Sequence, residues 1–164
     1  IIPRGRALGI TQHLPEKDKF SYTKKYLLSQ IKILLGGRIA EEIWFGNDNI
    51  TTGAANDIER ATELARSIVC KWGMSDKFGP ITYGKDDSPI FIGKELARYK
   101  DYSEHTAMEI DDEVKKIISE QYNEAKLIIE NNKNKVEELV SLLLEKETLQ
   151  TEEIESILGK KIKE

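Results

Sequence analysis

Asp57 is the residue of this chain whose type and setting most directly suggest chemistry. It lies in residues 51–62, where the pattern predicts that a helix begins near Ala54. Successive helical side chains step about 100° around the axis, so Asp57 shares a face with a mostly apolar set: Ala54, Ala61, Leu64, Ala65, Ile68 and Trp72. A carboxylate on such a face rarely lacks a partner.

Two explanations for Asp57 are open. An acid in the first turn satisfies backbone N–H groups and complements the helix dipole, which stabilises the helix by about 0.3–1 kcal/mol. The other explanation is that Asp57 binds a metal ion. Position alone favours the helix-end explanation, because first-turn Asp is common and metal ligands are few.

The elements before Asp57 are predicted to be a strand and a long helix. Residues 7–14 form an edge strand that Pro15 closes. The helix runs from about residue 23 to 44, with an apolar stripe of Leu27, Leu28, Ile31, Leu34 and Leu35. Gly36 and Gly37 each cost roughly 1 kcal/mol relative to Ala within a helix. We therefore expect either a neighbour packed on Gly36, Gly37 and Ala40, or a bend at the glycine pair.

The elements after Asp57 are predicted to be helical, apart from one long loop. The helix that carries Asp57 runs to about Trp72, and Gly73 is well placed to end it. Residues 75–102 lose periodicity, as functional or mobile loops do. From residue 103 an amphipathic helix with a stripe from Met108 to Ile129 follows, then a break at residues 131–132, another helix, and a short last helix with Thr151 as its N-cap.

Composition excludes several classes of protein. Hydrophobic residues make up 39% and charged residues 33% of 164 residues, and no run approaches the roughly 18 apolar residues of a membrane span. Net charge is −4, and no basic stripe with interleaved aromatics indicates a nucleic-acid partner. Cys70, the only cysteine, cannot form an internal disulfide, which fits a reducing compartment. The start at Ile1, without Met or a signal peptide, indicates a piece of a longer protein.

Four groups of residues, in this order and spacing, carry a resemblance to a known family. They are Ile2-Pro3-Arg4-Gly5 with Ala7-Leu8-Gly9 and Leu14-Pro15-Glu16; Leu34-Leu35-Gly36-Gly37-Arg38 with Ala40-Glu41-Glu42; Thr52-Gly53-Ala54 with Asn56-Asp57-Ile58; and Trp72-Gly73-Met74-Ser75 with Gly79-Pro80. Ile110-Asp111 with Glu113-Val114 is a fifth. Over nearly its whole length the chain resembles the peptidase domain of FtsH, the membrane-anchored, ATP-dependent zinc metalloprotease.

The resemblance implies a role for Asp57. In that family two His of an H-E-x-x-H helix and an Asp at this position hold zinc, whose fourth position stays open for the water that the motif's Glu deprotonates. The two histidines here, His13 and His105, belong to no such motif, which is expected upstream of Ile1. The isolated 164-residue stretch is therefore predicted to bind zinc weakly or not at all, and to be inactive.

Other residues are candidates for lesser roles at the site. Glu41 is an alternative metal ligand, or a partner of a zinc-bound His. Glu42 and Arg38, at i,i+4 spacing, are predicted to form a structural ion pair. By analogy with zinc peptidases, the edge strand binds extended substrate through Leu8, Gly9, Ile10 and Thr11. The alternative is an ordinary edge strand covered by a loop.

The resemblance also implies the setting of the chain. The expected fold is a mainly α metallopeptidase domain with a small β element near the N-terminus and a C-terminal helical bundle. Residues 1–102 are the C-terminal part of the catalytic core, and residues 103–164 are a helical subdomain. The expected whole is a homo-hexamer with an upstream ATP-binding AAA+ domain that unfolds and threads polypeptides, anchored in a bacterial inner membrane or an organelle membrane with the peptidase domain in the cytoplasm. The competing hypothesis is a non-catalytic helical module that braces an oligomeric ring.

Overall fold

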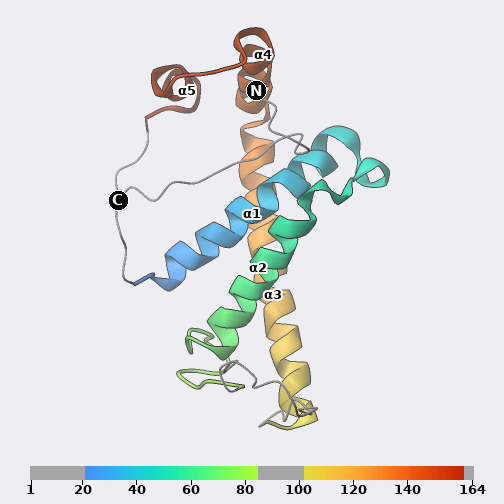
Figure 1. The fold of residues 1–164 in the computed structure, drawn as a ribbon, viewed down its shortest axis with the longest axis vertical. Helices are drawn as coiled ribbons and strands as arrows, with labels where there is room; N and C mark the ends of the chain where they lie inside the picture. Colours follow the sequence, from blue (N-terminus) through green and yellow to red (C-terminus); the bar gives the residue numbers. More distant parts are fainter. Residues whose placement is uncertain (1–20, 85–101, 161–164) are drawn as a thin grey trace, which may run out of the picture. The chain divides into compact units, whose positions relative to one another are not determined.

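The computed structural model describes residues 21–84 and 102–160, which are mainly helical, as predicted (Figure 1). The elements are α1 (Lys24–Phe45), the 3-10 helices η1 (Asn47–Asn49) and η2 (Thr52–Ala54), α2 (Ala55–Cys70), α3 (Glu104–Asn131), α4 (Lys133–Lys146) and α5 (Thr151–Leu158). These residues contain no strand, and the predicted strand at 7–14 lies outside them. None of the helices described is long and apolar enough to cross a membrane.

Helix α1 begins at an N-cap and buries one row of side chains. The Thr23 hydroxyl accepts a hydrogen bond from the Tyr26 N–H at 3.2 Å, which satisfies one free donor of the first turn. The buried residues follow each other at intervals of four: Leu27, Ile31, Leu35 and Ile39. Three residues of the predicted apolar stripe, Leu27, Ile31 and Leu35, are therefore buried as expected. Leu28 and Leu34 are only partly buried, and Ile39 continues the row beyond the glycine pair.

The glycine pair of α1 faces open space. A Cβ built at Gly36 or Gly37 meets no heavy atom within 4 Å, and Ile33 on this part of the helix is 47% exposed. Helix α1 is nevertheless continuous through both glycines. The neighbour predicted to pack on this surface is thus not found within residues 21–84 and 102–160.

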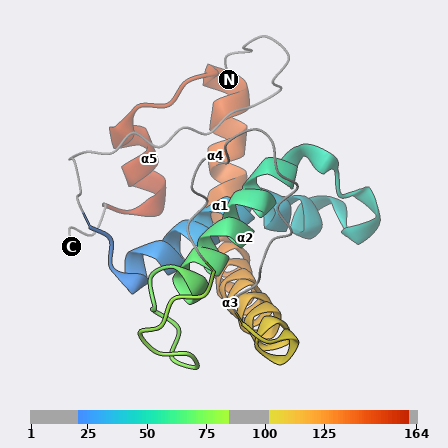
Figure 2. The same ribbon diagram turned by 60° about the horizontal axis from the view of Figure 1, so that its bottom comes forward.

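Helix α2 lies beside α1, as both views show (Figures 1 and 2). Its fully buried residues are Ala61, Ala65, Ile68 and Val69. The two alanines are small enough to let a neighbouring helix approach closely. The predicted buried face of this helix was therefore largely right.

The end of α2 corrects one prediction. The helix ends at Cys70, and Trp72, predicted to lie on the buried face, is 41% exposed. The Trp72 N–H donates to the Ser67 carbonyl at 2.9 Å, so the last turn is wider than an α-turn and Trp72 leaves the stripe. Gly73 follows with φ +57°, a left-handed conformation that glycine adopts readily.

Helix α3 as far as Lys126 belongs to the same compact unit as α1 and α2, Ser21–Lys126. It buries Ile110, Val114, Ile117 and Ala125, together with the polar residues Glu113 and Gln121. Met108, predicted in the apolar stripe, is instead 67% exposed. Ion pairs at the surface join Arg66 to Asp111 at 3.0 Å and Lys32 to Glu124.

Residues 127–160 belong to a second unit, which contains the end of α3, α4 and α5. The predicted break at residues 131–132 is confirmed, because α3 ends at Asn131 and α4 begins at Lys133. The N-cap of α5 is Gln150 rather than Thr151, since the Gln150 N–H donates to Glu153 Oε2 at 2.9 Å in a capping box. The division into domains at residues 102 and 103 stays a prediction.

Candidate functional site

Asp57 lies in the first turn of α2 and is partly buried. Ala54, three residues before it, is 8% exposed, and Ala61, four residues after it, is fully buried. Within the part of the chain that the structure describes, no hydrogen bond or ion pair reaches the Asp57 carboxylate. The side chain thus remains available to a ligand, at a helix end that favours negative charge.

The segment between α1 and α2 leads the chain to Asp57 by two tight turns. Gly46 ends α1 with φ +79°, and the Asn49 side-chain amide donates to the Phe45 carbonyl at 2.7 Å across η1. Ile50 and Thr51 are extended, and η2 then opens directly into α2. The position of Asp57 therefore depends on how this segment is held against α1.

Glu41 holds that segment with both of its carboxylate oxygens. Its Oε1 accepts the Thr51 hydroxyl at 2.6 Å, and its Oε2 accepts the Thr51 N–H at 3.1 Å. These hydrogen bonds, the hydroxyl first, lower the pKa of Glu41, because they stabilise its charged form. Glu41 is thus an anion whose two oxygens are both engaged with one residue of the connection.

Thr51 passes this restraint on to η2. Its hydroxyl oxygen accepts the Gly53 N–H at 3.2 Å, so one hydroxyl both donates to Glu41 and accepts from Gly53. Thr51 did not figure among the predicted site residues. A threonine just before a helix start is a capping signal that points to its own turn, but nothing in local spacing points to Glu41, ten residues earlier.

Glu42 has a structural role, as predicted, although its strongest partners lie on α3. Lys126 Nζ lies 2.7 Å from its Oε1, the Tyr122 hydroxyl donates to its Oε2, and Arg38 Nη1 is 3.9 Å away. Hydrogen bonds from Lys126 and Tyr122 lower the pKa of Glu42, while burial and the same bond raise the pKa of Tyr122 to about 12. Glu42 therefore ties α1 to α3.

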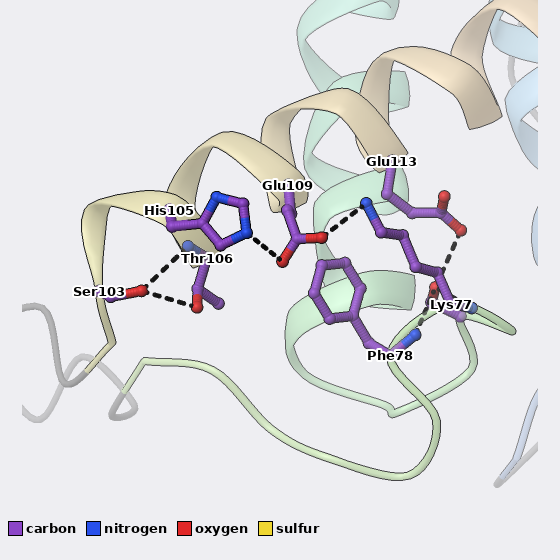
Figure 3. Close-up of polar contacts among 8 residues, drawn as sticks. Lys77, Phe78, Ser103, His105, Thr106, Glu109 and Glu113 are labelled. Carbon is purple, nitrogen blue, oxygen red and sulfur yellow. Dashed lines mark hydrogen bonds and ion pairs between the residues drawn. The ribbon is translucent and has the colours of Figure 1, made fainter.

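The motif that contains Ser75 and the motif that contains Glu113 meet in the N-terminal half of α3 (Figure 3). The Ser75 hydroxyl donates to Glu113 Oε1 at 2.9 Å and accepts the Lys77 N–H at 3.2 Å, and Ser75 and Glu113 are 4% and 8% exposed. One turn earlier on α3, Glu109 lies 3.2 Å from Lys77 Nζ. These contacts fasten the chain that follows α2 onto α3.

The described residues do not by themselves form a complete metal site. Neither described range contains a group of three or more His, Cys, Asp or Glu side chains placed to hold a metal ion. His105 is 82% exposed and lies 3.9 Å from Glu109 on the same helix. His13 and the predicted substrate residues Leu8, Gly9, Ile10 and Thr11 lie outside the described residues. Asp57, with a carboxylate that zinc accepts as a ligand, fits as a single contributor.

The chain is similar to known proteins over nearly its whole length. The family model for peptidase family M41 matches residues 1–157. The chain is 57% identical over 159 residues to an ATP-dependent zinc metalloprotease FtsH of Pseudothermotoga lettingae, and 51% identical over 160 residues to one of Thermotoga maritima. A third, of Nitrosococcus oceani, is 44% identical over all 164 residues.

These matches cover 96%, 97% and 100% of this chain. The chain spans about a quarter of the length of these relatives, since the matched part is 25%, 26% and 25% of them. The family match extends over nearly all of the sequence and includes residues 21–84, residues 102–157 and the predicted metal ligand Asp57. The chain therefore belongs to peptidase family M41.

Proposed function

We propose that this chain is the C-terminal part of the peptidase domain of an ATP-dependent zinc metalloendopeptidase, in which Asp57 is the third protein ligand of the metal. The observation that supports the proposal is the partial burial of Asp57 and the lack of a partner for its carboxylate among the described residues. Asp57 is a partly buried carboxylate at the start of α2, and no side chain or backbone donor of the described residues pairs with it. Carboxylates in such settings are normally paired or bound to a metal.

The other ligands come, in this proposal, from a segment outside these 164 residues. Zinc held by Asp57 and these ligands would supply Lewis-acid chemistry, which activates a water molecule for attack on a peptide carbonyl. Asp57 supplies one oxygen ligand and its negative charge, and α2 fixes its direction. Because His13 and His105 belong to no H-E-x-x-H motif, we expect the isolated stretch to bind zinc weakly or not at all and to lack peptidase activity.

The setting of the whole protein is also part of the proposal. We expect a homo-hexamer with an upstream AAA+ domain, which binds ATP and threads unfolded membrane and soluble proteins to the peptidase site. Anchoring in a membrane, with this domain on the cytoplasmic side, follows from the same family assignment. Residues 1–102 complete the catalytic core and residues 103–164 form a helical subdomain. The names of the relatives support the ATP dependence and the zinc.

The test is Asp57→Asn in the full-length protein, with Asp48→Asn as a matched control. Asp48 is an exposed acid in the first turn of η1, nine residues earlier. We expect Asp57→Asn to abolish proteolysis and to weaken zinc binding by more than the roughly 10–100-fold that loss of an outer partner causes. Assembly, measured by light scattering, should not change, and Asp48→Asn should behave like the wild type.

The opposite outcome is equally clear. If Asp57→Asn keeps full zinc content, measured by elemental mass spectrometry, and only lowers thermal stability slightly, Asp57 is a helix-end acid. Its effect would then be the few tenths to about 1 kcal/mol of a dipole interaction. The non-catalytic helical module would become the better description of this chain.

A further inference from the structure

The connection between α1 and α2 contains a short relay of hydrogen bonds that ends one turn before Asp57. Glu41 on α1 accepts both the hydroxyl and the N–H of Thr51, at 2.6 Å and 3.1 Å. The same hydroxyl accepts the Gly53 N–H at 3.2 Å inside η2. Since η2 continues into α2 without an intervening loop, the relay connects the end of α1 to the turn that carries Asp57.

The geometry limits what Glu41 can do. A hydroxyl has one hydrogen to donate, and Thr51 gives it to Glu41, which leaves the lone pairs of the oxygen for the Gly53 N–H. Hydrogen bonds to a carboxylate are about twice as strong as those between neutral groups. A metal ion bound by Glu41 would compete for the same two oxygens.

Gly53 supplies an observation independent of these hydrogen bonds. A Cβ built at Gly53 would lie 3.2 Å from the Thr51 hydroxyl oxygen and 3.9 Å from Glu41 Oε1. Any larger residue would therefore press on the Thr51 hydroxyl. The absence of a side chain at position 53 leaves room for the relay to close.

We propose that Glu41 is a positioning residue of the metal site: through Thr51 and Gly53 it holds the turn from which Asp57 projects, and it does not bind the metal itself. This inference rests on the proposed role of Asp57. It assigns Thr51, through its hydroxyl, to the same function. Metal ligands act only when held in a narrow range of geometry, so loosening the turn lowers affinity although Asp57 is intact.

The test compares four substitutions in the full-length protein. Thr51→Val removes the hydroxyl and keeps the N–H, and Thr51→Ser keeps both. Glu41→Gln replaces one acceptor oxygen by an amide. The control is Thr62→Val, which removes an exposed hydroxyl that only donates to the Ile58 carbonyl at 2.9 Å, one turn further along α2. Zinc affinity is measured by competition with a chromophoric chelator, and amide exchange at Gly53 is measured in the zinc-free protein.

We expect Thr51→Val and Glu41→Gln each to lower zinc affinity by about 10–100-fold and to speed exchange of the Gly53 amide. Thr51→Ser should restore both properties, and Thr62→Val should leave both unchanged. The double variant Glu41→Gln with Thr51→Val should lose less zinc affinity than the product of the two single effects, because both substitutions act on the same pair of residues. Rescue by serine separates this role from misfolding.

Two results would overturn the inference. If Glu41→Gln lowers zinc affinity while Thr51→Val does not, Glu41 acts on the metal directly. If neither variant changes affinity although Asp57→Asn does, the relay has no part in the site and only the inference fails. If Asp57→Asn itself leaves zinc binding intact, the proposed function fails, whatever the relay variants do to exchange at Gly53.

Discussion

Gly73 and Pro80 touch through their backbones: a Cβ built at Gly73 would lie 2.9 Å from the Pro80 Cα. The two residues belong to one predicted motif and are seven positions apart. The Tyr83 N–H donates to the Cys70 carbonyl at 2.9 Å, so the returning chain docks on the end of α2. Gly73 is therefore required for two reasons, its left-handed backbone and the space that it leaves for Pro80.

Substitution of Gly73 by alanine should separate these two reasons when compared with Gly79→Ala. Gly79 has φ +68° but nothing within 4 Å of its built Cβ, so its variant carries only the left-handed cost of about 1–2 kcal/mol. Gly73→Ala has the same kind of cost and adds a steric overlap with Pro80, which should cost a further amount of about 1–3 kcal/mol. The free energy of opening, from hydrogen exchange at the Tyr83 amide, measures both. Equal losses would show that the contact with Pro80 is unimportant.

The hydrogen bond between Ser75 and Glu113 should contribute more than the exposed ion pair on the same two segments. Ser75→Ala leaves a buried carboxylate without this donor, which costs about 1–3 kcal/mol. Asp111→Asn breaks the pair with Arg66, whose side chains are 52% and 67% exposed, and should cost about 0–1 kcal/mol. Hydrogen exchange along α3 in the full-length protein measures both. A larger loss for Asp111→Asn would contradict the ranking.

The contacts of Glu42 predict how stability depends on pH. The pKa of Glu42 is lowered in the folded chain, so its contribution is complete above its ordinary value and is lost as pH falls through the lowered value. The pKa of Tyr122 is raised to about 12 from 10, so its contribution is complete below pH 10 and is lost as pH rises toward 12. The free energy of unfolding should therefore decrease at both ends, as pH falls below the ordinary pKa of a glutamate and as pH rises from 10 toward 12.

Tyr122→Phe should remove the alkaline part of that pH dependence and leave the acid part. At neutral pH it should cost about 1.5–3 kcal/mol, the typical contribution of a hydrogen bond to a charged group. The ultraviolet absorbance of tyrosinate gives a direct check, because the titration step with the highest pKa should be missing from the titration curve of the variant. An unchanged titration curve would assign the high pKa to another tyrosine.

A further prediction concerns the edge strand expected from the sequence at residues 7–14. If substrate binds along it through main-chain hydrogen bonds, proline at Ile10 or Thr11 should raise the Michaelis constant of the full-length enzyme, because proline has no N–H to donate. The turnover number should change less. An unchanged Michaelis constant for a model polypeptide would refute this mode of binding.

Sequence periodicity was a good guide wherever helices pack on helices. The row Leu27, Ile31 and Leu35 and the break after Asn131 were predicted, because apolar spacing and paired asparagines are local signals. Helix ends were less predictable. Trp72 leaves α2 because the last turn widens, and Gln150 takes the cap that Thr151 was expected to provide. Neither helix end could be recognised from the pattern of apolar and polar residues along the sequence.

The candidate site was likewise predictable from the sequence only in part. Asp57 could be singled out from the sequence, since an acid on an apolar face is visible in the spacing alone. The pairing of Glu41 with Thr51 could not, because it depends on the path of the chain through Gly46, η1 and Thr51. The burial of Glu113 likewise depends on a contact with Ser75, 38 positions away.

The relay from Glu41 has a consequence for the order of folding. Its hydrogen bonds join residues only ten and two positions apart, whereas those between Glu42 and α3 join residues 80 and 84 positions apart. Closing a loop of about ten residues takes roughly 10–100 ns, and short closures lose little chain entropy. We therefore expect the turn that presents Asp57 to form on a growing chain long before α3 has been synthesised, with α3 later locking a structure that already exists.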